Sequence, residues 1–507
     1  MSFLKSVAPV LLKLRHKSLN KVCLNQAAAS GWIFQTRRLR RLFSRTSNME
    51  KSAGLQHLQQ AQQRIKQWSI HGGFNASNTD SLPVKCVGVV GGGGTMGSGI
   101  VMVLLNAGLR VVLVESNTES RDRAVQTMRN LYSNAVKLKK LSPEQTEKHL
   151  SRMIPTTEYS QLKRCDVVIE AVFENLELKK QIFNELDKIC PPHTILTSNT
   201  SSLDIDQLAA ATNRADKVMG THFFIPVYQS KLLENSYGRS TSPQTVATVM
   251  KLGQKIGKFP VLMKNCELFV ANRALIQYMW EATLLLEEGA DPSSVDTAVE
   301  EFGIPMGPFR LNDIIGHDTF DRITTESILK YGFSENGRFV NNTPYSAIHK
   351  ETFNSGRLGV KVGKGWYEYE KGSRDGFIDE DVLEILDRFR AEHNVQPRIH
   401  SKQEIIERCT LSMVHECFRI LQDGIISCPD DIDFICVTAL GWPKTTGGPL
   451  FYASRTGLNN LLAKMKHYRT SLTDALQWTP CELLVELAAQ DVPYAEWMSF
   501  LEKSSKL

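Results

Sequence analysis

The stretch VGVVGGGGTMGSGI (residues 87–100) places four consecutive glycines between a run of valines and a second segment punctuated by glycine. Residues 84–90 are mostly β-branched and predict a strand buried on both faces, as parallel sheets require. Residues 98–108 are small and apolar and indicate a helix. We therefore expect the chain to run here from a strand through a glycine loop into a helix.

The glycine loop has the G-x-G-x-x-G spacing of a dinucleotide-binding fold, a pattern that is informative only between a strand and a helix. The first glycine of the pattern permits a tight turn, the second lets backbone N–H groups approach a pyrophosphate, and the third lets the helix pack close to the strand. Gly91 and Gly93 are additional glycines that leave the register uncertain by one residue. The residues expected to contact the cofactor are Gly92, Gly94, Thr95, Met96 and Gly97.

A carboxylate follows the second predicted strand, where a dinucleotide fold binds a ribose. Residues 109–116 (LRVVLVES) predict a buried strand, and Glu115 near its end lies 18 residues after Gly97. A glutamate there binds both ribose hydroxyls and repels a 2′-phosphate, so NAD is favoured over NADP. The alternative is that Glu115 is a surface acid at the start of a helix.

Helices and strands continue to alternate after this acid. A helix is expected over 119–139, a strand over 165–172, a helix over 174–190 and a strand over 193–203. Such alternation predicts an α/β fold built on a Rossmann-type doubly wound parallel sheet.

A histidine and a glutamate are spaced so that a strand hairpin would bring them together. His222 falls near the end of the strand-like run 218–224, at the edge where open parallel sheets bind their ligands. Glu234 follows twelve residues later, beyond Pro226. A carboxylate beside an imidazole fixes its tautomer and raises its basicity, which suits a general base acting on an alcohol. A lone histidine in an apolar strand is more often a hydrogen-bonded core residue, and this alternative stays open here.

The C-terminal half contains one pattern twice. Residues 280–309 and 415–451 each carry a glutamate, a glycine eight residues later, then an aspartate and a Gly-Pro pair. This spacing predicts two repeated all-α domains after the sheet, of which the second has no neighbouring His–Glu pair and is expected to be structural. The corresponding residues are Glu281 and Glu416, Gly289 and Gly424, Asp296 and Asp433, and Gly307-Pro308 and Gly448-Pro449.

A set of ordered motifs resembles the L-3-hydroxyacyl-CoA dehydrogenase family over about residues 84–370. The motifs are GGGGTMGSGI, EAVFENLELKKQIFNELD, SNTSSLDI, THFFIPVYQSKLLE, VANR and GIPMGPFRLNDIIGHDT. The resemblance implies NAD as cofactor, an acyl-CoA substrate, and oxidation of L-3-hydroxyacyl-CoA to 3-ketoacyl-CoA in fatty acid β-oxidation. Relatives with one helical domain commonly pair through it, so a tandem copy is expected to replace that contact and favour a monomer.

The resemblance also assigns roles to polar residues that would otherwise be interpreted as helix caps or surface groups. It implies that His222 is the general base, oriented by Glu234, and that no metal ion takes part. Ser201 and Asn272 match positions that hydrogen-bond the substrate and order the site. The remaining cofactor contacts that it implies are Glu174, Lys179, Asn199 and Lys361.

Two positions depart from the family pattern. Ile225 stands where the family has Asn or Ser, and Leu268 where it has Gly. A hydrogen bond worth about 0.5–1.5 kcal/mol is therefore missing at residue 225, which corresponds to roughly tenfold in rate. Leu268 is expected to alter the hinge before the following helix. Two other functions stay open: a dehydrogenase of another 3-hydroxy acid, and a non-catalytic NAD-binding scaffold.

The chain is expected to divide into six segments. Residues 64–73 (RIKQWSIHGG) and the duplicated helical domain resemble the dehydrogenase half of peroxisomal bifunctional enzymes, in which an enoyl-CoA hydratase domain precedes the linker. Residues 1–80 lack the length and glycine content of a hydratase, so dehydrogenase activity alone is expected. The segments are a basic leader (1–48), a linker helix (49–80), the NAD-binding domain (81–267), the first helical domain (268–372), a linker (373–403) and the second helical repeat (404–507).

The two ends of the chain indicate different destinations. Residues 1–49 hold ten Lys and Arg and no Asp or Glu, which is typical of a mitochondrial transit peptide. The chain ends Ser505-Lys506-Leu507, the tripeptide that the peroxisomal import receptor binds. We expect a peroxisomal protein, with a mitochondrial location as the alternative, and translation starts at Met1 or at Met49.

Charge and composition argue against several other classes of protein. The residues after the leader carry a net charge of −4, so nucleic-acid binding is not expected. No apolar run of about 18 residues is present, and a membrane span is not expected. The ten cysteines form no Cys-x-x-Cys pair, which argues against a metal ribbon or a disulfide framework.

Overall fold

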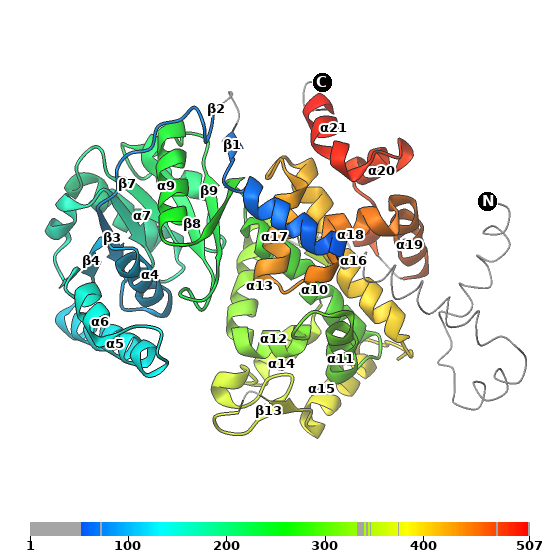
Figure 1. Ribbon diagram of the computed structural model, residues 1–507. Helices are drawn as coiled ribbons and strands as arrows, with labels where there is room; N and C mark the ends of the chain where they lie inside the picture. The colour runs from blue at the N-terminus through cyan, green and yellow to red at the C-terminus, as the bar shows by residue number, and fades with distance from the viewer. Residues whose placement is uncertain are drawn as a thin grey trace, which may run out of the picture.

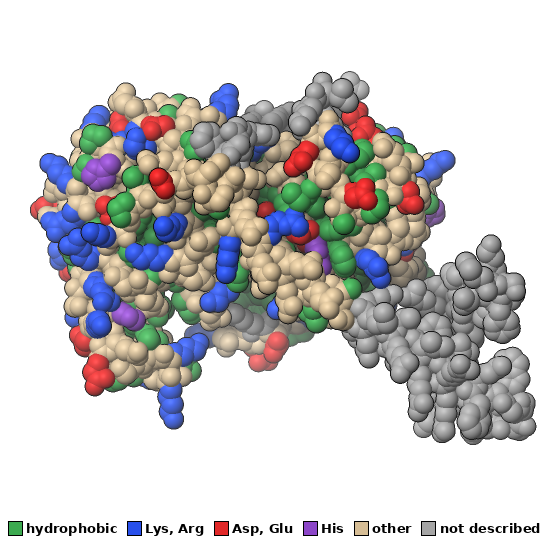
Figure 2. Space-filling model, turned by 45° about the horizontal axis from the view of Figure 1, so that its top comes forward, with side chains coloured by type: hydrophobic (Ala, Val, Ile, Leu, Met, Phe, Trp, Pro, Cys, Tyr) green, Lys and Arg blue, Asp and Glu red, His purple; other side chains and the backbone are tan. Residues whose placement is uncertain are grey.

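The computed structural model describes residues 52–504, apart from 71–73, 332–338, 341–342, 345, 374 and 473–474. A lobe built on a sheet and a lobe built of helices lie side by side (Figure 1). Figure 2 shows Lys and Arg side chains over both lobes, interspersed with acidic and apolar ones. Within the described ranges, no helix is both long and apolar enough to cross a membrane. The predicted leader and the terminal Ser505-Lys506-Leu507 lie outside the described residues.

An eight-stranded sheet forms the first lobe, in the order β10-β9-β8-β7-β6-β3-β4-β5. The six strands from β3 to β8 are parallel, whereas β9 returns antiparallel to β8 and β10 runs parallel to β9. The predicted Rossmann-type sheet is confirmed, with this two-strand extension of reversed direction. The strands are β3 (Cys86–Val90), β4 (Arg110–Val114), β5 (Met153–Thr156), β6 (Val167–Glu170), β7 (Ile195–Ser198), β8 (Val218–Phe223), β9 (Leu232–Tyr237) and β10 (Phe259–Lys264).

Helices cover both faces of the sheet, because successive residues of each buried strand point to opposite sides. On one face Val87 and Val89 pack in one core with α4, α5 and α9, and on the other Val90 and Val168 pack in a second core with α7 and α8. Asparagine side chains at positions 117 and 175 cap α5 and α7 by accepting from backbone N–H groups of the first turn. The helices are α4 (Thr95–Asn106), α5 (Thr118–Lys137), α6 (Pro143–Leu150), α7 (Leu176–Ile189), α8 (Ile205–Ala209) and α9 (Pro243–Lys255).

The second lobe contains the two predicted helical repeats. The segment expected as a linker (373–403) holds a further helix, α15 (Glu380–Glu392). The first repeat comprises α10 (Phe269–Glu287), α11 (Pro292–Phe302), α12 (Pro308–Ile315), α13 (His317–Tyr331) and α14 (Ile348–Asn354). The second comprises α16 (Lys402–Gln422), α17 (Pro429–Ala439), α18 (Pro449–Thr456), α19 (Leu458–Ser471), α20 (Glu482–Ala489) and α21 (Trp497–Ser504). Two-residue strands form the hairpins β1–β2 (Ser69–Ile70, Phe74–Asn75), β11–β12 (Phe339–Val340, Thr343–Pro344) and β13–β14 (Glu368–Tyr369, Gly376–Phe377).

The paired aspartates of the repeat perform the same task in both copies. Asp296 accepts hydrogen bonds from the first backbone N–H groups of α12, and Asp433 does the same for α18. A Cβ on Gly307 would lie 2.2 Å from the Asp296 carboxyl carbon, and one on Gly448 would lie 2.3 Å from the Asp433 Cβ. The Gly-Pro pair therefore recurs because only glycine leaves room for a buried aspartate at the start of the helix.

The two repeats also contact each other reciprocally, through α10 and α16. Arg273 on α10 donates from Nε to Glu416 on α16 at 2.7 Å, and Arg408 on α16 donates from Nε to Glu281 on α10 at 2.6 Å. Arg273 also reaches Asp423, and Arg408 also reaches Glu288. The first of these ion pairs joins residues 143 positions apart in the chain and the second joins residues 127 positions apart, while the two arginines lie 135 positions apart, as the two glutamates do. This reciprocity is the pattern of a two-fold symmetric dimer interface, here formed within one chain.

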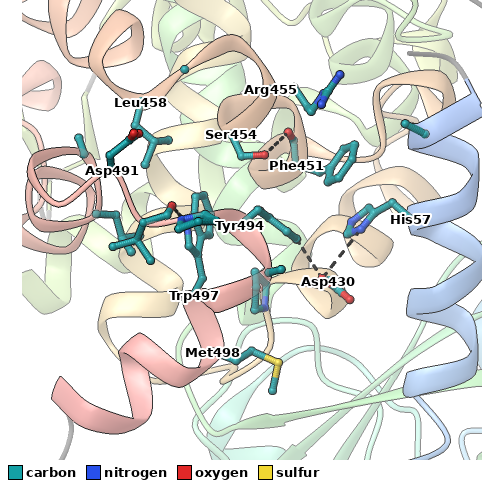
Figure 3. A pocket seen from close by; sticks show the side chains of 18 of the residues that line it. His57, Asp430, Phe451, Ser454, Arg455, Leu458, Asp491, Tyr494, Trp497 and Met498 are labelled. Atoms are coloured by element: carbon teal, nitrogen blue, oxygen red, sulfur yellow. Dashed lines mark hydrogen bonds and ion pairs between the residues drawn. The ribbon is translucent and has the colours of Figure 1, made fainter. Parts of the chain in front are cut away.

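Of the segment predicted as a linker helix (49–80), residues 52–64 are helical and pack against the second repeat, and the β1–β2 hairpin follows where the helix was expected to continue (Figure 1). His57 lies with Nε2 3.0 Å from Asp433 and stacks on Phe451, and Arg64 pairs with Asp430 at 2.7 Å. Beside these contacts a cavity of about 790 Å³ opens between this helix, α17, α18 and the C-terminal helices (Figure 3). The linker helix is thus tied to the second repeat by two buried aspartates of α17, which contact the buried His57 and the partly exposed Arg64.

Candidate active site

The glycine loop joins β3 to α4 at the carboxyl edge of the parallel strands. Gly91 has φ of 77°, so the left-handed turn falls one residue before the predicted Gly92. A Cβ on Gly97 would lie 2.1 Å from the carbonyl oxygen of Gly91, so only glycine lets the helix approach the loop this closely. The tight turn is thus at Gly91, within the one-residue uncertainty in register that the sequence leaves. The close approach of the helix is at Gly97, as predicted.

The start of α4 has the features of an anion-binding helix terminus. Its N-cap residue, Gly94, provides no side-chain cap, and the first turn, which begins with Thr95 and Met96, contains no acidic residue. Its first backbone N–H groups are therefore available to a phosphate. Glu115 follows β4 and accepts a hydrogen bond from the backbone N–H of Gly93 at 2.7 Å, which places the carboxylate directly beside the loop. These donors and this acid fit the pyrophosphate and ribose of NAD.

His222 and Glu234 are brought together by the register of two antiparallel strands. The two residues are direct partners across β8 and β9, and His222 Nδ1 lies 2.7 Å from Glu234 Oε2. Glu234 is fully buried, and its other oxygen accepts the backbone N–H of Ala271 on α10 at 2.9 Å. The imidazole is thus held by a carboxylate that is itself fixed by the helical lobe.

Ser201 and Asn272 meet at the junction of the two lobes. The Asn272 side chain, in the first turn of α10, donates to the carbonyl oxygen of Ser201 at 3.2 Å. Leu268 immediately before this helix has φ of 62°, the left-handed conformation that glycine adopts without strain. Leucine at position 268, where the family pattern has glycine, therefore strains the backbone.

Glu174 connects the loop after β7 to helix α7. Its Oε1 accepts the backbone N–H of Ser201 at 2.9 Å and the hydroxyl of Thr200 at 2.5 Å. Its Oε2 lies 3.2 Å from Lys179 Nζ. Burial acts to raise the pKa of Glu174, but Lys179 and these hydrogen bonds outweigh it and lower that pKa below the ordinary value. Glu174 is therefore held as a carboxylate behind Ser201.

The remaining predicted residues have different surroundings. Lys179 is only 1% exposed and is surrounded by protein acceptors. Asn199 accepts the backbone N–H of Phe223, next to His222, at 2.9 Å. Lys361 pairs with Asp318 at the start of α13, and both are about half exposed. The Ile225 side chain is 67% exposed, beside a cis peptide bond to Pro226.

One buried residue of this region was assigned no role above, although it begins the motif EAVFENLELKKQIFNELD. Glu170, the last residue of β6, is fully buried and accepts hydrogen bonds from Lys179 and Ser198. The sequence signal was present, because a glutamate ends an otherwise apolar buried strand at a sheet edge where ligands bind.

Comparison with known proteins identifies two family domains in the chain. Residues 86–266 match the NAD binding domain of 3-hydroxyacyl-CoA dehydrogenase, and residues 269–369 match its C-terminal domain. The human peroxisomal bifunctional enzyme is 39% identical over 468 residues, which cover 90% of this chain and 64% of the human protein. The chain thus spans less than two thirds of the length of that relative.

Two solved structures are similar over most of their own length. A 3-hydroxybutyryl-CoA dehydrogenase from Escherichia coli K12 superposes with a TM-score of 0.69 at 27% identity, covering 81% of this chain and 99% of the other. The (S)-3-hydroxybutyryl-CoA dehydrogenase PaaH1 from Ralstonia eutropha is 36% identical, with a TM-score of 0.53, over 57% of this chain and all of the other. The chain belongs to the 3-hydroxyacyl-CoA dehydrogenase family of NAD-dependent oxidoreductases.

Proposed function

We propose that this protein oxidises the 3-hydroxyl group of L-3-hydroxyacyl-CoA to a ketone, as a step of fatty acid β-oxidation. The observation that carries the proposal is the His222–Glu234 pair at the end of β8. The glycine loop follows β3, which is parallel to β8 in the same sheet, so the pair and the loop lie at one edge. A base for the alcohol and a site for a dinucleotide thus lie at the same edge of one sheet.

His222 acts as the general base. With Nδ1–H donated to Glu234, the lone pair of Nε2 is available to accept the proton of the 3-hydroxyl. The C3–H bond would break as the C=O double bond forms, and its electron pair would leave as hydride. NAD, when bound, supplies the hydride acceptor. Glu234 stabilises the imidazolium that forms, and Ala271 N–H keeps that carboxylate in place.

Ser201 and Asn272 position the substrate in this proposal. The Ser201 hydroxyl is held near Glu174 at 3.4 Å, and the Asn272 amide fixes the Ser201 backbone. Holding the alcohol oriented between His222 and the cofactor removes much of the entropic barrier to hydride transfer.

A substrate panel tests the proposal. Formation of NADH is followed at 340 nm with L-3-hydroxyacyl-CoA thioesters of short to long chain, with the matching free 3-hydroxy acids, and with the D-enantiomers. Turnover of the L-thioesters supports the proposal. Turnover of free acids alone assigns another 3-hydroxy acid as substrate, and NAD binding without any turnover assigns a scaffold.

The cellular location and the assembly state belong to the same proposal. The terminal Ser505-Lys506-Leu507 and the peroxisomal name of the human relative support import into peroxisomes. The reciprocal contacts of Arg273 and Arg408 support a monomer, because they reproduce a dimer interface internally. Fluorescence microscopy of the full chain with and without the tripeptide tests the first point. Sedimentation equilibrium tests the second, and a mass of one chain is expected.

A further inference from the structure

Glu170 is a buried carboxylate with protein donors on both oxygens. Its Oε1 accepts from the backbone N–H of Val172 at 2.6 Å and from Lys179 Nζ at 2.8 Å. Its Oε2 accepts from the Ser198 hydroxyl at 2.6 Å and from Lys179 Nζ at 3.0 Å. A charged pair without solvent is costly, and it persists where surrounding hydrogen bonds satisfy both partners.

The first arm of this network runs through Lys179. Besides Glu170, the ammonium group contacts the carbonyl oxygen of Val172 at 3.3 Å and Oε2 of Glu174 at 3.2 Å. Glu174 in turn holds the backbone N–H of Ser201. Glu170 thereby holds Lys179 in place, and Lys179 in turn holds the Glu174 carboxylate behind Ser201.

The second arm runs through the backbone of the β7 loop. The carbonyl oxygen of Glu170 accepts the N–H of Asn199 at 2.7 Å, and the Ser198 hydroxyl accepts the N–H of Thr200 at 3.2 Å. Asn199 then accepts the N–H of Phe223, the residue after His222. Both arms converge on residues 199–202 and on the end of β8.

We propose that Glu170 is a positioning residue for the dehydrogenase site: it holds loop 199–202, and with it Ser201, in register with His222. The inference rests on the proposed function for its catalytic consequence. Glu170 touches neither substrate nor cofactor in this account, because its oxygens are occupied by Val172, Lys179 and Ser198. Its effect on turnover passes through Ser201.

The variant Glu170→Gln keeps the size of the side chain and removes its charge. Lys179 is then left with Glu174 as its carboxylate partner, and Glu174 is drawn away from Ser201. Misplacement of a positioning loop lowers kcat/KM on the order of 10- to 100-fold. The matched control is Glu177→Gln on α7, the helix that carries Lys179. The Glu177 carboxylate pairs with Lys180 and is 74% exposed, so this variant is expected to leave kcat/KM unchanged.

A double-mutant cycle with Ser201→Ala separates positioning from general destabilisation. If Glu170 acts through Ser201, the loss caused by Glu170→Gln shrinks to about twofold or less when Ser201 is already alanine. An equal loss in both backgrounds overturns the proposal.

Hydrogen–deuterium exchange gives a readout that does not depend on turnover. The peptide covering residues 196–204 is expected to exchange about tenfold faster in Glu170→Gln than in wild type. Its exchange rate in Glu177→Gln is expected to equal that of wild type. Unchanged exchange in Glu170→Gln overturns the inference even if the wild-type enzyme is active. A wild-type protein without turnover overturns the proposed function instead, while exchange still decides the role of Glu170. If Glu170→Gln does not fold, Ser198→Ala removes one arm alone, and a smaller acceleration in the same peptide is expected.

Discussion

His222 and Glu234 face each other on neighbouring antiparallel strands, with Nδ1 of the imidazole 2.7 Å from Oε2 of the carboxylate. The other oxygen of Glu234 accepts a backbone N–H from α10. One carboxylate therefore joins the strand that carries the histidine, its own strand and the helical lobe. Any shift between the lobes would change the support of the imidazole.

Replacing Glu234 by glutamine tests this support. The amide is similar in size but cannot stabilise an imidazolium by charge, and its NH2 group can present the wrong hydrogen-bond partner to Nδ1. We expect kcat/KM to fall on the order of 10²- to 10⁴-fold, with NAD affinity little changed. Stopped-flow NADH formation and NAD titration measure the two quantities. A variant with wild-type kcat/KM would contradict the role of Glu234.

Leu268→Gly is expected to stabilise the protein. Leu268 has φ of 62°, which costs a residue with a Cβ about 1–2 kcal/mol; glycine removes this strain but loses about 0.5–1 kcal/mol of unfolded-chain entropy. The free energy of unfolding should therefore rise by about 0.5–1 kcal/mol. The control is Leu138→Gly at the end of α5, where φ is −80° and no strain is relieved. Denaturant midpoints measure both, and equal effects would refute the strain argument.

The two reciprocal arginines, Arg408 and Arg273, differ in burial, so their replacement is expected to lower the free energy of unfolding by unequal amounts. Arg408 is fully buried against the fully buried Glu281, whereas the Arg273 side chain is 18% exposed. Arg408→Met leaves Glu281 as an unpaired buried charge and is expected to cost about 3–5 kcal/mol. Arg273→Met should cost less. Thermal unfolding measures which of the two variants loses more stability. The double variant Arg408→Met/Glu281→Gln should recover part of the stability that Arg408→Met loses.

The pH dependence of stability should include a contribution from Asp296. Burial raises its pKa to about 7, against the lowering effect of the hydrogen bonds from Phe309, Tyr367 and Arg310. An acid whose pKa is higher in the folded state than in the unfolded state stabilises the fold most at pH values below its unfolded pKa of about 4. This stabilisation is lost as the pH rises towards the folded-state pKa of about 7. Asp296→Asn is therefore expected to show a smaller loss of stability between pH 4 and pH 7. Urea unfolding at several pH values measures the slope, and identical slopes would contradict the prediction.

Much of the fold follows from local patterns in the sequence. The glycine spacing, the β-branched strands and the acid at Glu115 specify the dinucleotide fold, because each has a steric or electrostatic reason at its position. The repeat follows from the shared order of a glutamate, a glycine eight residues later, an aspartate and a Gly-Pro pair, since the buried Asp296 and Asp433 each need a glycine beside them. His222 and Glu234 come together because the second strand returns antiparallel to the first and places residue 234 opposite residue 222.

Other features depend on tertiary packing, which a single sequence does not encode locally. Lys179 matched a cofactor contact by resemblance, but the structure places it behind the loop on Glu170, because the carboxylate at the end of β6 reaches it there. The partner of Lys361 is Asp318, on a separate helix of the same repeat. The reciprocal arginines were not predicted either, since ion pairs between residues 143 and 127 positions apart leave no local pattern.

The most direct test of the account compares wild type with His222→Asn, using NADH formation from L-3-hydroxyacyl-CoA together with NAD binding measured by calorimetry. We expect the variant to bind NAD with wild-type affinity and to lose turnover on the order of 10²- to 10⁴-fold. A variant that binds NAD and oxidises the thioester at the wild-type rate would contradict the assignment of His222 as the base.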